Sequence, residues 1–334
     1  MTSMTKRERV LAAIRHERPD RTPHNVFFTN QSLQRMIEYT GAPDYIDTIG
    51  NHISLMRLRK PKRPIPGNEE HLLDEFGVEF DISGADKDIG AVVNCIINDI
   101  DKMNAYEPPA IDEAWLREAG QRHVAAGGDT FTVALLGFSL FERAWSLCGM
   151  ENLLCYMLTD ADAVRSLLAK IVAYNLSKVR IAAECGFDGV MFGDDWGYQR
   201  GLIMGPALWR SLIKPYVAEM YAYVKSQGRI VLHHSCGDCR EIMGDLTEMG
   251  LDVYQTFQPE IYGLNKLRGL TIWGGISTQV DLPFRTPREI YDITVRTMNA
   301  LGEGGGYIAA PTHDVPGDVP PENIEAMIRA FKGE

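Results

Sequence analysis

His234 and Cys236 are the two residues of this sequence whose types and spacing point most directly to chemistry. They follow an apolar run at 230–232 that is typical of a buried strand. Because they are two residues apart, their side chains leave an extended backbone on the same face and can converge on one ion. Imidazole nitrogen and thiolate sulfur are both zinc ligands. A His-x-Cys pair also arises by chance, since buried histidines and inert cysteines are common, so the pair predicts a zinc site only with further support.

That support comes from His313, which lies just past the last predicted strand. Three protein ligands with one open position are the catalytic form of a zinc site, so we expect His234, Cys236 and His313 to bind one Zn²⁺ per chain. Glu260 could complete the site in place of His313, and Cys239 could be a fourth ligand or simply a residue in the first turn of a helix. Cys236 and Cys239 also form a Cys-x-x-Cys pair. A thioredoxin-like redox pair is expected early in a small domain, whereas this pair lies late in a long chain, so a redox role is disfavoured.

Predicted strands and helices alternate regularly after Gly128. Apolar, β-branched runs predict strands at 130–136, 189–192, 230–233, 253–257, 271–276 and 307–310. Helical periodicity is found at 160–185, 205–227, 239–249, 260–268, 287–301 and 321–332. Thr286-Pro-Arg-Glu is a capping box with proline at the first helical position, which predicts a helix start there. This alternation predicts a parallel sheet with helical crossovers.

The N-terminal part has a weaker pattern. An amphipathic helix is predicted at 4–16, where it would cover the floor of a barrel, and a first strand at 21–30. Residues 31–125 are expected to be an irregular insertion or elaboration of the barrel, with a helix near 31–39 and short strands near 77–83 and 91–96. The whole chain, 1–334, is expected to be a single domain.

Polar residues follow nearly every predicted strand, which distinguishes a closed (β/α)₈ barrel from an open sheet that binds at one switch point. We therefore predict an α/β fold of the TIM barrel type with an N-terminal elaboration. Asp194 and Asp195 leave an extended chain on opposite faces, so we expect Asp195 to act at the mouth with His234 and His313, and Asp194 to cap the following turn. The residues expected to bind substrate there are Asn25, Phe27, Trp196, Tyr198, Gln199, Tyr254, Gln255 and Gln279.

Aromatic residues at the mouth could stack on a flat substrate, although Trp196 and Tyr198 could equally cover the top of the barrel. The net charge of −11 and the lack of a basic run disfavour nucleic acid and anionic membrane as partners. No apolar run is long enough to span a bilayer, and the N-terminus lacks a signal-peptide core, so we expect a cytoplasmic protein. Six cysteines scattered over a long chain are not expected to form disulfides.

Motifs spread over nearly the whole chain match one known family, most weakly over 31–125. They are Asp20-Arg-Thr-Pro, Gly193-Asp-Asp-Trp-Gly, His234-Ser-Cys-Gly, Trp273-Gly-Gly-Ile-Ser-Thr-Gln, Gly305-Gly-Tyr-Ile-Ala-Ala-Pro-Thr-His and Pro320-Pro-Glu-Asn. Together they resemble the uroporphyrinogen decarboxylase superfamily, which implies a (β/α)₈ barrel. One branch of that family decarboxylates uroporphyrinogen III without a cofactor. The other consists of zinc methyltransferases that exchange methyl groups with a corrinoid protein.

The resemblance to the methyltransferase branch is closest at His234 and Cys236, which match its His-x-Cys zinc ligands. The third ligand of that branch is a cysteine, and His313 stands at the matching position, which argues against a plain coenzyme M enzyme. The decarboxylase signature Met-Arg-Gln-Ala-Gly-Arg is absent from the first strand. No Asp-x-His-x-x-Gly corrinoid motif is present, so the corrinoid is expected on a separate protein.

These features predict a zinc-dependent methyltransferase that moves a methyl group from a small methylated substrate, a methoxylated aromatic compound, to the Co(I) corrinoid of a partner protein. The alternative is a cofactor-free decarboxylase of the uroporphyrinogen type, which would bind its acidic substrate through arginines. A third hypothesis is a non-enzymatic tetrapyrrole or corrinoid binding protein, in which ligand binding would not depend on His234 or Cys236.

Overall fold

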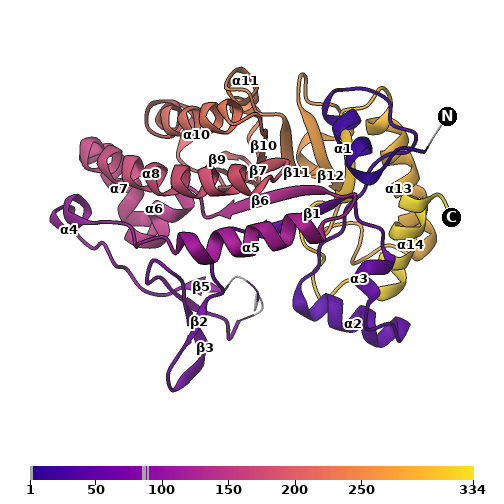
Figure 1. Ribbon diagram of the computed structural model, residues 1–334, viewed down its shortest axis with the longest axis horizontal. Helices are drawn as coiled ribbons and strands as arrows, with labels where there is room; N and C mark the ends of the chain where they lie inside the picture. The colour runs from indigo at the N-terminus through magenta and orange to yellow at the C-terminus, as the bar shows by residue number, and fades with distance from the viewer. Residues whose placement is uncertain (1–2, 85–87, 89) are drawn as a thin grey trace.

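Seven parallel strands form one curled sheet with helices around it (Figure 1). The computed structural model describes residues 3–84, 88 and 90–334. Along the sheet the strands follow the order β1, β6, β7, β10, β11, β12, β13, and every neighbouring pair is parallel. Their bounds are β1 Ile53–Arg57, β6 Phe131–Gly137, β7 Gly189–Gly193, β10 Ile230–His234, β11 Val253–Phe257, β12 Thr271–Ile276 and β13 Tyr307–Pro311.

A short extended segment closes the sheet between its two edge strands. The backbone of Asn25 donates to Ala309 O at 2.9 Å, and Ala309 donates to Pro23 O at 2.8 Å. On the other side, His52 donates from its backbone N–H to His24 O at 3.1 Å. The first strand is thus reduced to a bridge between His24 and Ala309. The expected (β/α)₈ barrel is confirmed, and its first strand is much shorter than the predicted 21–30.

The helices after β6 follow the predicted alternation, although no helix was predicted at 141–148 or 150–159. The prediction of a helix at 260–268 was too long, because Gly263, at φ 63°, ends α12 in the left-handed region that favours glycine. The capping box at Thr286 is confirmed. The helices are α6 Phe141–Cys148, α7 Met150–Thr159, α8 Ala161–Cys185, α9 Gly205–Leu208, η1 Trp209–Ile213, α10 Lys214–Ser226, η2 Arg240–Ile242, α11 Met243–Glu248, α12 Pro259–Tyr262, α13 Pro287–Gly302 and α14 Pro321–Lys332, and a small hairpin is formed by β8 Gly197–Tyr198 and β9 Gly201–Leu202.

Residues 31–125 contain more of the barrel than their sequence pattern indicated, although 85–87 and 89 lie outside the described residues. Strand β1 is the second barrel strand, and it pairs with β6 over its full length. A separate antiparallel sheet of four strands matches the expected elaboration. Its strands are β2 Arg63–Ile65, β3 Asn68–Leu73, β4 Glu79–Asp81 and β5 Ala91–Val92, and the helices of this part are α2 Asn30–Thr40, α3 Tyr45–Thr48, α4 Ile100–Ala105 and α5 Glu113–Ala126.

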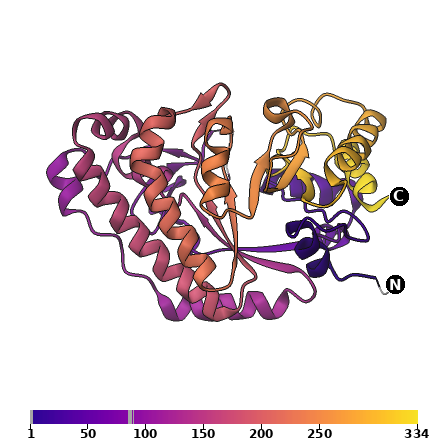
Figure 2. The same ribbon diagram turned by 90° about the horizontal axis from the view of Figure 1, so that it is seen from above.

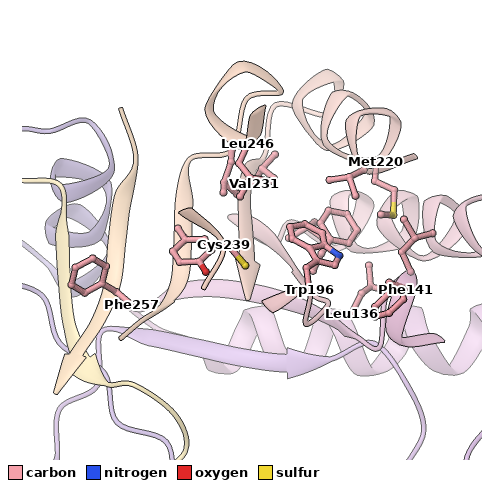
Figure 3. Packing of buried hydrophobic residues seen from close by; sticks show 14 of the residues in the cluster. Leu136, Phe141, Trp196, Met220, Val231, Cys239, Leu246 and Phe257 are labelled. Carbon is pink, nitrogen blue, oxygen red and sulfur yellow. The ribbon is translucent and has the colours of Figure 1, made fainter. Parts of the chain in front are cut away.

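Two apolar clusters hold the barrel together. One fills the interior and includes Leu135, Leu232 and Trp273. The other lies between the strands and the surrounding helices (Figure 3). Helix α1 (Lys6–Ile14) closes the amino ends of the strands, as predicted, since Val10 and Ala13 join the interior cluster. With this floor sealed, the interior opens at the carboxyl ends of the strands, where barrel enzymes place their active sites.

Both chain ends lie on the same side of the molecule in the two views (Figures 1 and 2). All six cysteines are unpaired, in agreement with the sequence-based expectation. No helix among the described residues is long and apolar enough to cross a membrane.

Candidate metal centre

His234, Cys236 and His313 converge at the mouth of the barrel. His234 is the last residue of β10, Cys236 lies two residues beyond it, and His313 lies two residues beyond β13. One ligand atom from each of the three lies within 4.8 Å of the others. The distance from Cys236 Sγ to His234 Nε2 is 3.5 Å. Two atoms bound tetrahedrally to one Zn²⁺ would lie about 3.5 Å apart, so this pair fits the ion.

The alternation of side chains along β10 explains why His234 and not His233 faces the interior. Leu232, which has the same parity as His234, belongs to the interior cluster. His233 points outward, where it lies 2.7 Å from the hydroxyl of Tyr221 and stacks on Trp196 at 4.2 Å between ring centroids. Burial lowers the pKa of His233 to about 3, so this imidazole is neutral and structural.

Gln255 orients the imidazole of His234. It lies opposite His234 on the neighbouring strand β11, and its side-chain oxygen accepts a hydrogen bond from Nδ1 of His234. An oxygen can only accept, so Nδ1 holds the proton and Nε2 presents a lone pair beside Cys236. Gln255 was predicted to bind substrate, and the structure places it behind a candidate ligand instead.

The two adjacent aspartates have different environments. Asp194 is fully buried, and its carboxylate accepts the backbone N–H groups of Leu140, Phe141 and Glu142 at 2.8–3.2 Å. It thereby caps the start of α6, not the turn after its own strand as predicted. The indole N–H of Trp196 also donates to it at 2.6 Å. Burial outweighs these hydrogen bonds and raises the pKa of Asp194 to about 6.

Asp195 faces the candidate ligands. Its Oδ1 accepts the backbone N–H of Cys236 at 2.7 Å and lies 3.5 Å from Nε2 of His234. Glu142, which sequence reasoning did not single out, lies nearby on α6, and burial together with Asp195 and Asp194 raises its pKa well above the ordinary value. Burial, Asp195 and Glu142 likewise raise the pKa of the Cys236 thiol. A divalent cation at this position would displace the thiol proton.

Cys239 and Glu260 do not join the three candidate ligands. Figure 3 shows Cys239 in the cluster of buried apolar side chains. Its sulfur lies 3.4 Å from the hydroxyl of Ser235. Glu260 instead accepts a hydrogen bond from Ser277. These surroundings fit Cys239 as a residue in the first turn of a helix and not as a fourth metal ligand.

A cavity of about 290 Å³ adjoins Cys236 and His313. Tyr198, Gln199 and Gln279 lie in its wall, as expected from the sequence. Thr256, Gln258, Thr278 and Thr312 were missed as site residues, and they complete much of the wall. Among the described residues that line this cavity, none is Arg, Lys, Asp or Glu. The described wall therefore has no charged side chain apart from the candidate ligands.

Gln258 presents a hydrogen-bond donor to this cavity. Its side-chain oxygen accepts the backbone N–H of Gly237 at 2.8 Å. Because that contact fixes the orientation of the amide, the NH₂ group is the end that remains available. Gly237 follows Cys236 directly, so this hydrogen bond attaches Gln258 to the segment that carries a candidate ligand.

Four residues predicted to bind substrate lie elsewhere. Asn25 accepts the backbone N–H of Ile53 at 3.0 Å and helps close the barrel, and Phe27 packs on Trp273 inside it. Trp196 is fully buried against Trp209 and His233. Figure 3 shows it within the apolar cluster. Tyr254 donates to Ser235 O at 3.0 Å. The prediction of an aromatic platform at the mouth was wrong for Phe27, Trp196 and Tyr254, because these side chains pack in the apolar clusters.

Comparison with known proteins gives one family. The family model described as uroporphyrinogen decarboxylase (URO-D) matches residues 71–333. Curated uroporphyrinogen decarboxylases of Coxiella burnetii, from strains Dugway 5J108-111 and RSA 493, are 23% identical over 360 residues, covering 98% of this chain and 95% of theirs. Among solved structures, a methyltransferase from Methanosarcina mazei is similar with a TM-score of 0.75 and 17% identity, covering 99% of each chain. Because the identity is only 17%, this structural match supports the fold alone.

Proposed function

Because the chain belongs to the uroporphyrinogen decarboxylase family, we propose that it is a zinc-dependent methyltransferase of that family. It would move a methyl group from a small methoxylated substrate to the Co(I) corrinoid of a separate partner protein. The observation that supports this proposal is the convergence of His234, Cys236 and His313 beside an open cavity. Three ligands with room for a fourth are typical of catalytic zinc.

The residues of the site have distinct roles in this proposal. Bound by His234, Cys236 and His313, Zn²⁺ would act as a Lewis acid on the oxygen that holds the methyl group. Gln255 keeps Nε2 of His234 deprotonated, and Asp195 holds the backbone of Cys236 in place. The NH₂ group of Gln258 would donate to an oxygen of the substrate as negative charge develops on it.

The cavity limits the substrate in size and charge. An apolar cavity of about 150 Å³ can hold benzene, so about 290 Å³ accommodates a substituted ring. The uncharged wall suits ether, hydroxyl or carbonyl groups, and Tyr198 supplies one aromatic side chain beside them. A methoxylated phenol such as guaiacol is therefore the first donor to test. The methyl acceptor would reach the cavity through the open mouth of the barrel.

A decarboxylase is the second candidate, because the curated relatives have that activity. It predicts turnover without metal and cationic contacts to an acidic substrate. The lack of Arg and Lys among the described residues of the cavity wall disfavours it.

The test begins with metal content, measured by elemental mass spectrometry on protein purified without chelator. Wild type is expected to contain about one zinc per chain, Cys236→Ser much less, and Cys239→Ser as much as wild type. Methyl transfer is then followed by the loss of the Co(I) spectrum of cob(I)alamin on addition of guaiacol. Zinc-free wild-type protein that releases CO₂ from uroporphyrinogen would overturn the proposal in favour of the decarboxylase.

A further inference from the structure

A second, smaller cavity lies at the carboxyl ends of β1 and β6, where these strands meet helices α6 and α8. Its volume is about 20 Å³, which is enough for one water-sized group. Arg59 and Phe138, which follow the two strands, contribute to its wall, as do Arg143 from α6 and Lys178 from α8. The described wall of the cavity beside the candidate metal centre contains no Arg or Lys, so the described parts of the two cavities differ in charge.

Two ion pairs account for two of the three cations. Arg143 Nη1 lies 2.7 Å from Asp74 Oδ2, and both side chains are buried. Lys178 Nζ lies 2.5 Å from Glu75 Oε1, and the lysine side chain is 4% exposed. Arg59 makes no hydrogen bond or ion pair with any residue that the structure describes. Three cations therefore face two carboxylates, which leaves one positive charge without a counterion.

Arg59 is half-buried, so water reaches only part of this charge. Burial lowers the pKa of Arg59, and it lowers the pKa of Lys178 even though Glu75 is bonded to it. The guanidinium of Arg143 lies 3.9 Å from the ring centroid of Phe76, and its buried Nε has no hydrogen-bond partner among the described residues. A buried donor without an acceptor is rare in folded proteins. One anionic acceptor in the cavity would satisfy both the surplus charge and the unpaired N–H.

We propose that this cavity binds a small monovalent anion, a single halide ion, among Arg59, Arg143 and Lys178. The anion would supply the third negative charge and accept the free N–H of Arg143. The small volume excludes large anions. This site is independent of zinc and of methyl transfer, so it can be tested without either.

The test compares bromide, an anion of one atom, with gluconate, a six-carbon anion that is too large to enter. Thermal unfolding is measured across a bromide series in which sodium gluconate keeps the ionic strength constant. Arg59→Gln removes the unpaired cation. Arg57→Gln is the matched control, because Arg57 is exposed, ends the same strand and carries the same charge.

Wild type and Arg57→Gln are expected to gain stability with bromide along a saturable curve, and Arg59→Gln should need at least tenfold more bromide. In gluconate alone, Arg59→Gln should melt no lower than wild type, since the variant loses an uncompensated charge. Crystals soaked in bromide should show an anomalous peak between Arg59 and Arg143. Identical bromide curves for all three proteins, or no peak in the cavity, would overturn the proposal.

Discussion

Gln255 and His234 lie opposite each other on strands β11 and β10, and the side-chain oxygen of Gln255 accepts the N–H of the His234 imidazole. This pairing leaves Nε2 of His234 as a lone-pair donor 3.5 Å from the sulfur of Cys236. The relationship determines which tautomer His234 adopts, and the tautomer determines whether the histidine can bind a metal ion.

Replacing Gln255 with leucine should therefore weaken zinc binding by about 10- to 100-fold, as is typical for the loss of such a partner. Competition with a chromophoric chelator measures the affinity. Gln279→Leu is the control, because Gln279 lies in the cavity wall and not behind a ligand. Equal affinity in Gln255→Leu and wild type would show that the hydrogen bond does not prepare His234 for the ion.

His313 can be tested as the third ligand by replacing it with two different residues. His313→Ala should lose most of its bound zinc, because only two of the three converging side chains remain. His313→Cys should retain zinc, since thiolate is also a zinc ligand. Zinc content by elemental mass spectrometry distinguishes the outcomes. Full zinc occupancy in His313→Ala would remove His313 from the site.

Alanine variants of Asp194 and Asp195 can be compared for their effect on the free energy of unfolding. Asp194→Ala leaves several buried N–H donors at the start of α6 without an acceptor, so the free energy of unfolding should fall by about 3 kcal/mol or more. Asp195→Ala removes a partly exposed side chain and should cost much less stability. Urea unfolding followed by circular dichroism measures both. Similar losses in the two variants would contradict the assignment of Asp194 as the cap.

The sequence predicted those parts of the barrel that depend on local pattern. Strands β6 and β7, buried on both faces, read as apolar runs, whereas β1 is half-exposed along most of its length and was missed. The two-residue spacing of His234 and Cys236 placed both side chains on one face without any tertiary information.

The rest of the site depends on contacts between distant segments. The role of Gln255 requires the register of β10 against β11, and the role of Asp194 requires the position of α6, which is 50 residues away in the chain. Trp196 and Tyr254 were predicted at the mouth because of their residue types. Their burial depends on the helices that cover them, which residue type does not reveal.

Gln258 should affect turnover without affecting the metal. In Gln258→Glu one carboxylate oxygen can still accept from Gly237, while the other presents an acceptor where the cavity now has a donor. With guaiacol and cob(I)alamin, kcat/KM should fall by about 100-fold, the usual cost of losing one such donor, while zinc content stays near one per chain. Gln199→Glu places the same charge in the same wall and controls for it. An equal loss in both variants would indicate a charge effect and not a lost donor.

His24 and His52 should make the stability of the barrel depend on pH. Both lie where the first segment closes the sheet, and burial lowers the pKa of His24 to about 4 and of His52 to about 3, from an ordinary value of 6.5. Below pH 6.5 the unfolded chain therefore binds protons that the folded chain does not, so the free energy of unfolding falls as the pH falls from 6.5 toward 4. Each histidine contributes a slope of up to about 1.4 kcal/mol per pH unit in that window.

Urea unfolding at several pH values between 7 and 4.5 gives the slope of the free energy of unfolding against pH. His52→Gln should reduce this slope by the contribution of one histidine, up to about 1.4 kcal/mol per pH unit. An unchanged slope in His52→Gln would mean that His52 takes up its proton in the folded protein as readily as in the unfolded chain.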